Sequence, residues 1–192
     1  MDTKEQILEA AIAVFSEKGY HKASMDQVAA EAKVSKGAIY YFFKNKNELF
    51  LEIIASGFYL LNEELSKIVD SDLDVPQAIY HTVSAYVNLC LDYPRLAMII
   101  LSESTDNLDP DLSDSINRLL GQIVDQIISL LDEAEKYMAM RPCRKEILAV
   151  SFLGMLSGIC IRQIRFEYPY ERRDIIDELS DTLLHGILQG SL

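Results

Sequence analysis

The stretch from Ser24 to Lys46 reads SMDQVAAEAKVSKGAIYYFFKNK, and its pattern predicts two short helices joined by a tight turn. Ser24 is placed to cap the first helix, and Gln27, three residues later, completes a capping box. Ser35 can cap the second helix directly after a turn at residues 33–34. The stretch therefore predicts a helix–turn–helix unit.

The second helix of this unit has an inner side and an outer side. Ile39 and Phe43 lie four residues apart, so both point the same way, into a small core. The outer side carries Lys36, Gly37, Tyr40, Tyr41 and Lys44. Two aromatic hydroxyls, a lysine and a glycine near a helix N-terminus suit close approach to a phosphate backbone.

The charge of this stretch differs from that of the whole chain. Four lysines and no acidic residue lie between Lys33 and Lys46, whereas the chain has a formal net charge of −12. An ordinary helical hairpin with solvated lysines would explain the helices equally well. It would not explain a basic island on an acidic chain, which favours nucleic-acid binding.

The run from Phe15 through Leu49 carries a resemblance to a known family. FSEKGY followed by VSKGAIYYFFKNKNEL resembles the DNA-binding region of the tetracycline-repressor (TetR) family, over about the first fifty residues. Ala38 and Phe42 stand where that family often has Thr and Tyr, so each lacks a hydroxyl. The resemblance implies a dimer paired through the last two helices and a C-terminal domain that binds a small effector.

Composition predicts a globular, helical, cytoplasmic protein. Of its 192 residues, 49% are hydrophobic and 25% are charged, and the whole −12 lies after residue 50. Three cysteines without C-x-x-C spacing are expected to be free thiols in a reducing cytosol, with a redox sensor as the alternative. The longest uncharged run, Ile147 to Ile161, is shorter than the roughly 20 apolar residues of a membrane span.

The pattern along the chain predicts an all-α fold of about nine helices. Thr3 is expected to cap the first helix, which should end at Lys18-Gly19. We expect a three-helix DNA-binding domain over residues 1–46 and a larger helical domain for ligand binding and dimerisation over residues 47–192. A long fourth helix, beginning after Asn45, should link the two.

No catalytic or metal site is predicted. The histidines His21, His81 and His185 lie far apart in sequence, and no Gly-rich phosphate loop occurs. We therefore expect neither an enzyme nor a cofactor. The alternative is a helical adaptor or an enzyme bundle that carries an incidental helix–turn–helix.

The last two helices are expected to form the dimer interface. Gly154 and Gly158, four residues apart, have no bulky side chain to fill a core, and the terminal helix has an apolar stripe. The predicted interface residues are Gly154, Gly158, Ile176, Leu179, Leu183 and Ile187. An apolar stripe of this kind is also what a monomer core requires.

The middle helices carry aromatic and soft side chains that are usually core residues. The resemblance implies that some of them line a pocket for a small, largely apolar effector. The expected pocket residues are Phe58, Leu61, Tyr86, Cys90, Met98, Phe152, Met155 and Ile159.

These observations and the resemblance predict a dimeric, ligand-responsive DNA-binding regulator, a repressor that reads a palindromic operator. By position, Ser24, Ser35, Tyr40 and Lys46 should hold phosphates. Lys36, Gly37 and Tyr41 should approach base edges. Effector binding should act on the helix–turn–helix of residues 24–46, the reading unit, through the long fourth helix.

Overall fold

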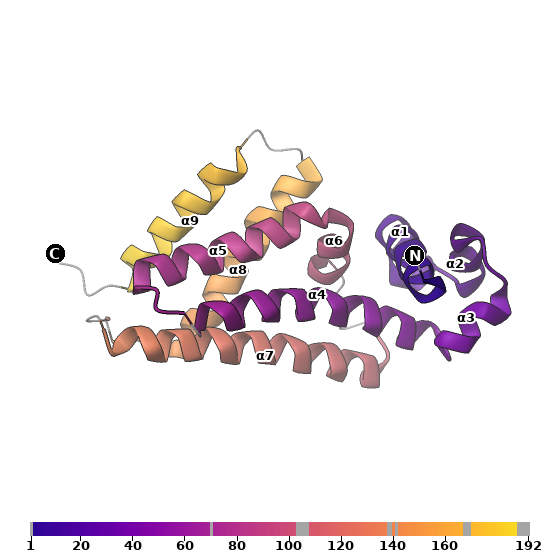
Figure 1. Ribbon diagram of the computed structural model, residues 1–192, viewed down its shortest axis with the longest axis horizontal. Helices are drawn as coiled ribbons and strands as arrows, with labels where there is room; N and C mark the ends of the chain where they lie inside the picture. The colour runs from indigo at the N-terminus through magenta and orange to yellow at the C-terminus, as the bar shows by residue number, and fades with distance from the viewer. Residues whose placement is uncertain are drawn as a thin grey trace. The chain divides into compact units, whose positions relative to one another are not determined.

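The computed structural model describes residues 2–69, 71–102, 108–137, 140, 142–166 and 170–187, without the side chains of residues 69, 102 and 187. No strand occurs in these ranges, which confirms the all-α prediction. The helices labelled in Figure 1 are α1 (Thr3–Lys22), α2 (Met25–Ala32), α3 (Lys36–Phe42), α4 (Lys46–Val69), α5 (Val75–Asp92), α6 (Pro94–Ser102), α7 (Pro110–Glu135), α8 (Lys145–Phe166) and α9 (Arg172–Ile187).

The ends of α1 differ from the prediction. Asp2, not Thr3, caps its start, in a reciprocal capping box with Glu5. At its end Gly19 takes the expected left-handed φ, 72°, but the helix resumes after this kink and continues to Lys22. The local signal for an irregular backbone at Gly19 was therefore correct, and the predicted end of the helix was wrong.

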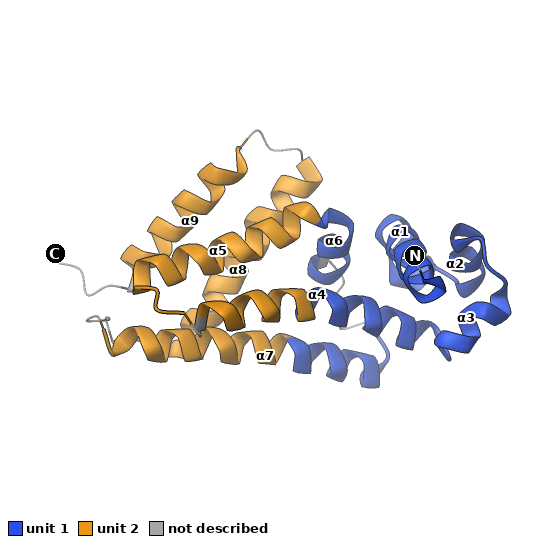
Figure 2. Cartoon of the chain, in the orientation of Figure 1, with its two compact units in different colours: residues 1–58, 93–119 blue, residues 59–92, 120–192 orange. Residues whose placement is uncertain are grey.

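The chain forms two compact units, coloured separately in Figure 2. Unit 1 comprises residues 1–58 and 93–119, and unit 2 comprises residues 59–92 and 120–192. Both α4 and α7 contribute residues to each unit. This division by packing differs from the expected division by role at residues 46–47, which stays a prediction.

The core of unit 1 supports the helix–turn–helix pair. Ile7, Val28 and Ile39 are fully buried, and they come from α1, α2 and α3. The Phe15 ring meets the Phe50 ring edge to face, with centroids 5.2 Å apart. Burial of these large side chains is the main stabilising term for a helix pair too short to be stable alone.

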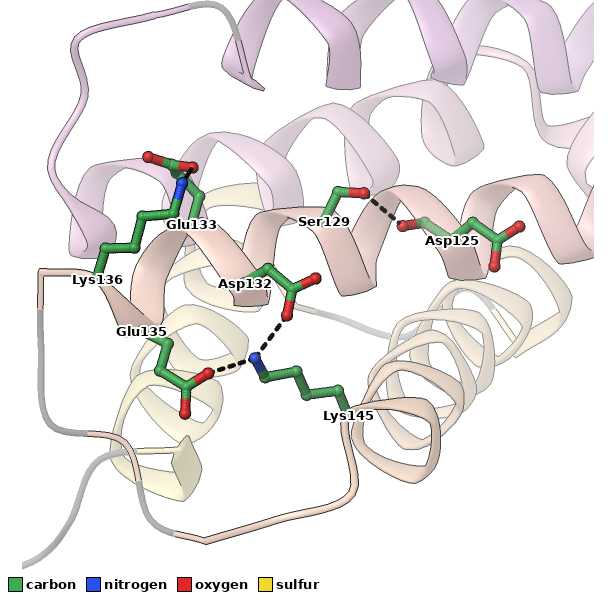
Figure 3. A network of polar contacts seen from close by, with 7 residues as sticks. All are labelled: Asp125, Ser129, Asp132, Glu133, Glu135, Lys136 and Lys145. Carbon is green, nitrogen blue, oxygen red and sulfur yellow. Dashed lines mark hydrogen bonds and ion pairs between the residues drawn. The ribbon is translucent and has the colours of Figure 1, made fainter.

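The core of unit 2 is built on α5, which packs against both α8 and α9. Val83 and Val87 of α5 are fully buried, as is Leu156 of α8. Figure 3 shows a further link within this unit, where the Lys145 ammonium at the start of α8 bridges the carboxylates of Asp132 and Glu135 near the end of α7. Because these charges are largely exposed, the bridges add little stability.

Candidate functional site

The α2–α3 pair forms the helix–turn–helix unit that the sequence predicts. Ser24 and Gln27 cap α2 reciprocally, and the Ser35 hydroxyl oxygen accepts a backbone N–H of α3 at 3.2 Å. Between the helices, Lys33 takes a left-handed conformation with φ 55°, and its N–H donates to the Ala30 carbonyl at 3.2 Å. The caps and this single left-handed residue fix the angle of the turn.

The outer side of α3 is exposed as predicted. Tyr41 is 83% exposed and Tyr40 is 45% exposed, whereas Ile39, directly before them, is fully buried. Lys36, Gly37 and Lys44 are also exposed. An added Cβ at Gly37 would meet only the Ser35 hydroxyl, at 3.9 Å, so the backbone of α3 is open to close approach at this point.

Lys36 has an acidic neighbour that the sequence pattern did not indicate. Its ammonium nitrogen lies 2.6 Å from a carboxylate oxygen of Asp26, in the first turn of α2. The hydrogen bond and the charge of Asp26 raise the pKa of Lys36, so the lysine is a cation at neutral pH. Ten residues separate the pair, and no local periodicity predicts a contact across the turn.

Ser24 and Ser35 each keep a hydrogen to donate. Their hydroxyl oxygens accept backbone N–H groups at 3.3 Å and 3.2 Å, so the O–H of each serine points elsewhere. Both residues are exposed at helix starts. A capping serine can therefore bind a phosphate without giving up its cap.

Lys46 is engaged inside unit 1. Its ammonium donates to the carbonyls of Tyr20 at 2.8 Å and Ala23 at 3.1 Å, and it lies 4.2 Å from the centre of the Tyr20 ring. Partial burial lowers the pKa of this lysine. The Tyr20 hydroxyl in turn donates to the side-chain oxygen of Asn47. The lysine that was predicted to hold a phosphate thus closes the end of α1 with two of its three N–H donors.

Unit 2 contains a cavity of about 100 Å³ with mainly apolar walls. Residues of α4, α5, α7, α8 and α9 line it, among them Ile79, Ile127 and Leu183. Of the predicted pocket residues, only Phe152 lines this cavity.

The other predicted pocket residues lie elsewhere for identifiable reasons. The Tyr86 hydroxyl lies 2.6 Å from that of Ser157, and the free thiol of Cys90 is hydrogen-bonded to that of Cys160, so both residues join α5 to α8. This hydrogen bond and burial raise the pKa of the Cys90 thiol. Phe58, Leu61 and Ile159 do not line the cavity; Met98 belongs to unit 1, and Met155 is 39% exposed.

The predicted dimer residues divide into two groups. Gly154 and Gly158 are exposed, and an added Cβ at either would meet no atom within 4 Å. Ile176 and Leu183 are buried in unit 2, because the stripe of α9 packs against α5, so neither is free for a partner chain. Leu179 is half-buried, and the side chain of Ile187 lies outside the described residues.

The exposed face of α8 is more apolar than the two glycines alone indicated. Ile147 is 61% exposed and Val150 is 58% exposed, on the helix that carries Gly154, Met155 and Gly158. By length and composition, α8 is also the one helix of the described chain that could cross a membrane, although the fifteen-residue run appeared too short in the sequence. Only 17% of its apolar window is fully buried in the single chain, so one face of this helix lacks intrachain cover.

No cluster of three or more His, Cys, Asp or Glu side chains that could hold a metal ion occurs among the described residues. The chemistry available at the helix–turn–helix surface consists of hydrogen-bond donors, two phenols and mobile cations. Such groups bind without breaking covalent bonds.

Comparison with known proteins identifies the class of this chain. The sequence profile described as "Bacterial regulatory proteins, tetR family" matches residues 7–53. The HTH-type transcriptional regulator YhgD of Bacillus subtilis is 27% identical over 187 residues, which are 97% of each chain. The HTH-type transcriptional repressor NicS of Pseudomonas putida is 24% identical over 159 residues, covering 82% of this chain and 74% of NicS.

Solved structures share the fold along almost the whole chain. The regulator FadR from Bacillus subtilis, crystallised with stearoyl-CoA, superposes with a TM-score of 0.84 at 20% identity and covers 95% of this chain and 98% of its own. AibR, crystallised with isovaleryl coenzyme A and operator DNA, superposes with a TM-score of 0.80 at 23% identity. It covers 94% of this chain and 97% of its own. With the profile match over the helix–turn–helix and relatives that are regulators rather than enzymes, the chain belongs to the tetR family of bacterial regulatory proteins and is a DNA-binding transcriptional regulator.

Proposed function

We propose that this regulator is a repressor that binds a palindromic operator as a dimer and releases it when a small effector occupies unit 2. The exposed outer side of α3, with Lys36 and two tyrosines, carries the proposal. The regulator then acts in the cytoplasm, where the operator DNA is found.

The reading surface divides into positioning and sequence-reading groups. Ser24, Ser35 and Tyr40 offer hydroxyl donors to phosphates, and Lys46 adds its one remaining N–H. Lys36, Gly37 and Tyr41 face outward along α3, where they can reach base edges in the major groove. The Lys36 ammonium pairs with Asp26 at 2.6 Å, and because both groups are exposed this weak pair leaves the lysine free to turn toward the DNA.

The exposed face of α8 supports the dimer. Its glycines leave open space for a second helix, and Ile147 and Val150 supply apolar area that the single chain does not cover. A second copy of the same face would bury both and place two α3 helices on one side of the DNA. Half-sites should then lie about 34–36 Å apart, or further if two dimers share an operator.

The effector is proposed to be an acyl thioester, the class of ligand present in the FadR and AibR crystal structures. The apolar cavity in unit 2 suits an acyl group. Because α4 contributes residues to both units, a small tilt of this helix would link occupancy of the cavity to the reading unit.

A gel shift tests the proposal directly. The probe is the region upstream of the chain's own gene, at 50 and 200 mM salt, beside a scrambled probe of equal length. Wild type should prefer the upstream probe at both salts, and Lys36→Ala should lose that preference by about five- to 150-fold, the usual value of a base contact.

Asp26→Asn is the matched control for Lys36→Ala. Removing a negative charge beside the phosphates should tighten binding to both probes while keeping the preference. If wild type shows no preference at either salt, the chain does not regulate its own gene through this surface. If the two variants lose preference equally, Lys36 does not read bases.

A further inference from the structure

The cavity in unit 2 is too small for a long acyl chain. It holds about 100 Å³, and its walls include Ile127, Leu131 and Phe152. A cavity of about 150 Å³ lined by such side chains binds benzene, so about 100 Å³ accommodates about four or five carbon atoms. Thr82 is the one buried polar side chain of the described core, and it also lines this cavity.

A second, polar hollow adjoins the apolar cavity. It has a volume of about 270 Å³, and His81, Ser84 and Asn88 of α5 form one wall. Ile68, Ser71 and Leu73, at the end of α4 and just after it, line both volumes. A molecule that extends past these three residues would have an apolar end in the cavity and a polar end in the hollow.

The charges of the hollow cancel. Lys67 and Glu64 both line it, and they pair with each other at 2.5 Å. Asn88 is also engaged, because its amide donates to the Ser84 hydroxyl oxygen and its carbonyl accepts from Arg172. The Ser84 O–H and the His81 ring remain as hydrogen-bonding groups for a guest. Such a wall suits a neutral group rich in amides or hydroxyls and gives no unpaired cation to a carboxylate or phosphate.

We infer that the effector is a short acyl thioester, with an acyl group of about four or five carbons in the apolar cavity and the neutral amide arm of the thioester in the polar hollow. This assignment rests on the proposed function and restricts its effector class. A free short-chain acid is disfavoured, because its carboxylate would lie near Ser71 and Leu73 without a free cation. The volume of a stearoyl chain exceeds that of the apolar cavity.

Titration calorimetry on the full chain with butyryl-, isovaleryl-, octanoyl- and stearoyl-CoA tests the length limit. Butyryl-pantetheine, butyrate and free CoA identify the part of the ligand that is recognised. Affinity should rise about fourfold per added methylene up to about five carbons, then fall. Butyryl-pantetheine should bind about as well as butyryl-CoA, and butyrate should bind at least about tenfold more weakly, since one unpaired charge is left.

Two substitutions in the cavity wall should have different effects on acyl binding, one by enlarging the cavity and the other by filling it. Phe152→Leu enlarges the cavity and should favour a chain longer by about one or two carbons. Ala78→Phe fills it and should abolish acyl binding while operator binding persists. Ser84→Ala, in the hollow, should weaken all thioesters alike and leave the preferred length unchanged.

The outcomes separate this inference from the proposed function. Tighter binding of stearoyl-CoA than of isovaleryl-CoA, or equal binding of butyrate and its thioester, would overturn the assignment. If no thioester binds while the gel shift still shows operator preference, the bipartite site is wrong and the regulator stands. Loss of operator preference in the gel shift would instead remove the proposed function itself.

Discussion

Lys46 joins the end of one helix to the start of another. Its backbone begins α4, and its ammonium closes α1 by donating to the carbonyls of Tyr20 and Ala23. A cation at the negative end of a helix is favourable both as a donor and through the helix dipole. The residue therefore stabilises the reading unit whether or not it also reaches a phosphate.

Lys46→Met separates these two roles. The substitution keeps the length of the side chain and removes the donors, so the stability of the chain should fall by about 1–2 kcal/mol. Thermal unfolding measures this loss, and anisotropy titrations at several salts measure the salt slope of DNA binding. If the role is structural, the slope stays unchanged.

Lys44→Met is the matched control for Lys46→Met, since Lys44 is exposed and its ammonium makes no contact with the part of the chain that the structure describes. It should leave the unfolding midpoint unchanged and flatten the salt slope by about one unit for each chain on the DNA. The reverse pattern, with Lys46→Met changing only the slope, would restore the phosphate role to Lys46.

The helix α8 carries the interface prediction, and Gly158 tests it cleanly. An added side chain at this position meets no atom within 4 Å, and Leu is a better helix former than Gly by about 0.8 kcal/mol. Gly158→Leu should therefore keep or raise the helix content of the single chain. By filling the space meant for a second α8, it should convert a dimer to a monomer in light scattering and abolish operator binding.

Gly121 of α7 provides the comparison, because an added Cβ there also meets nothing within 4 Å. Gly121→Leu should remain dimeric and bind the operator. A Gly158→Leu variant that stays dimeric would place the interface elsewhere.

Local signals located the elements well. The caps at Ser24 and Ser35 were predicted correctly. Capping and periodicity depend on neighbours within about four residues, so a single sequence contains them.

The partner of an apolar face was harder to predict. Periodicity correctly gave α9 an apolar stripe, but it did not indicate whether α5 or a second chain covers Ile176. A pocket was expected, but Phe152 alone of the residues predicted to line it does so, because the cavity results from small gaps among five helices. The contact of Lys36 with Asp26 likewise depends on the angle of the turn.

The molecule as a whole is strongly acidic, whereas the stretch from Lys33 to Lys46 holds four lysines and no acidic residue. The net charge of −12 lies after residue 50, while residues 1–50 balance. Repulsion of the acidic part from the duplex leaves the reading unit as the surface of contact.

Salt dependence should report how many lysines meet phosphates. Within residues 24–46, Lys33 and Lys44 are the exposed lysines without an ion pair in the described structure, so a dimer brings four. The slope of log K against log salt concentration should then be about −4. Anisotropy titrations between 50 and 200 mM salt measure it, and a slope near −8 would show that further lysines or a second dimer take part.

Lys33 has a consequence for anyone who redesigns this regulator. A lysine in the left-handed region is strained relative to glycine by about 1 kcal/mol, so a stability-guided search will select glycine at this position. The same exchange deletes one of the few cations directed toward the operator. Here the stability of the fold and the affinity for DNA oppose each other at a single backbone angle.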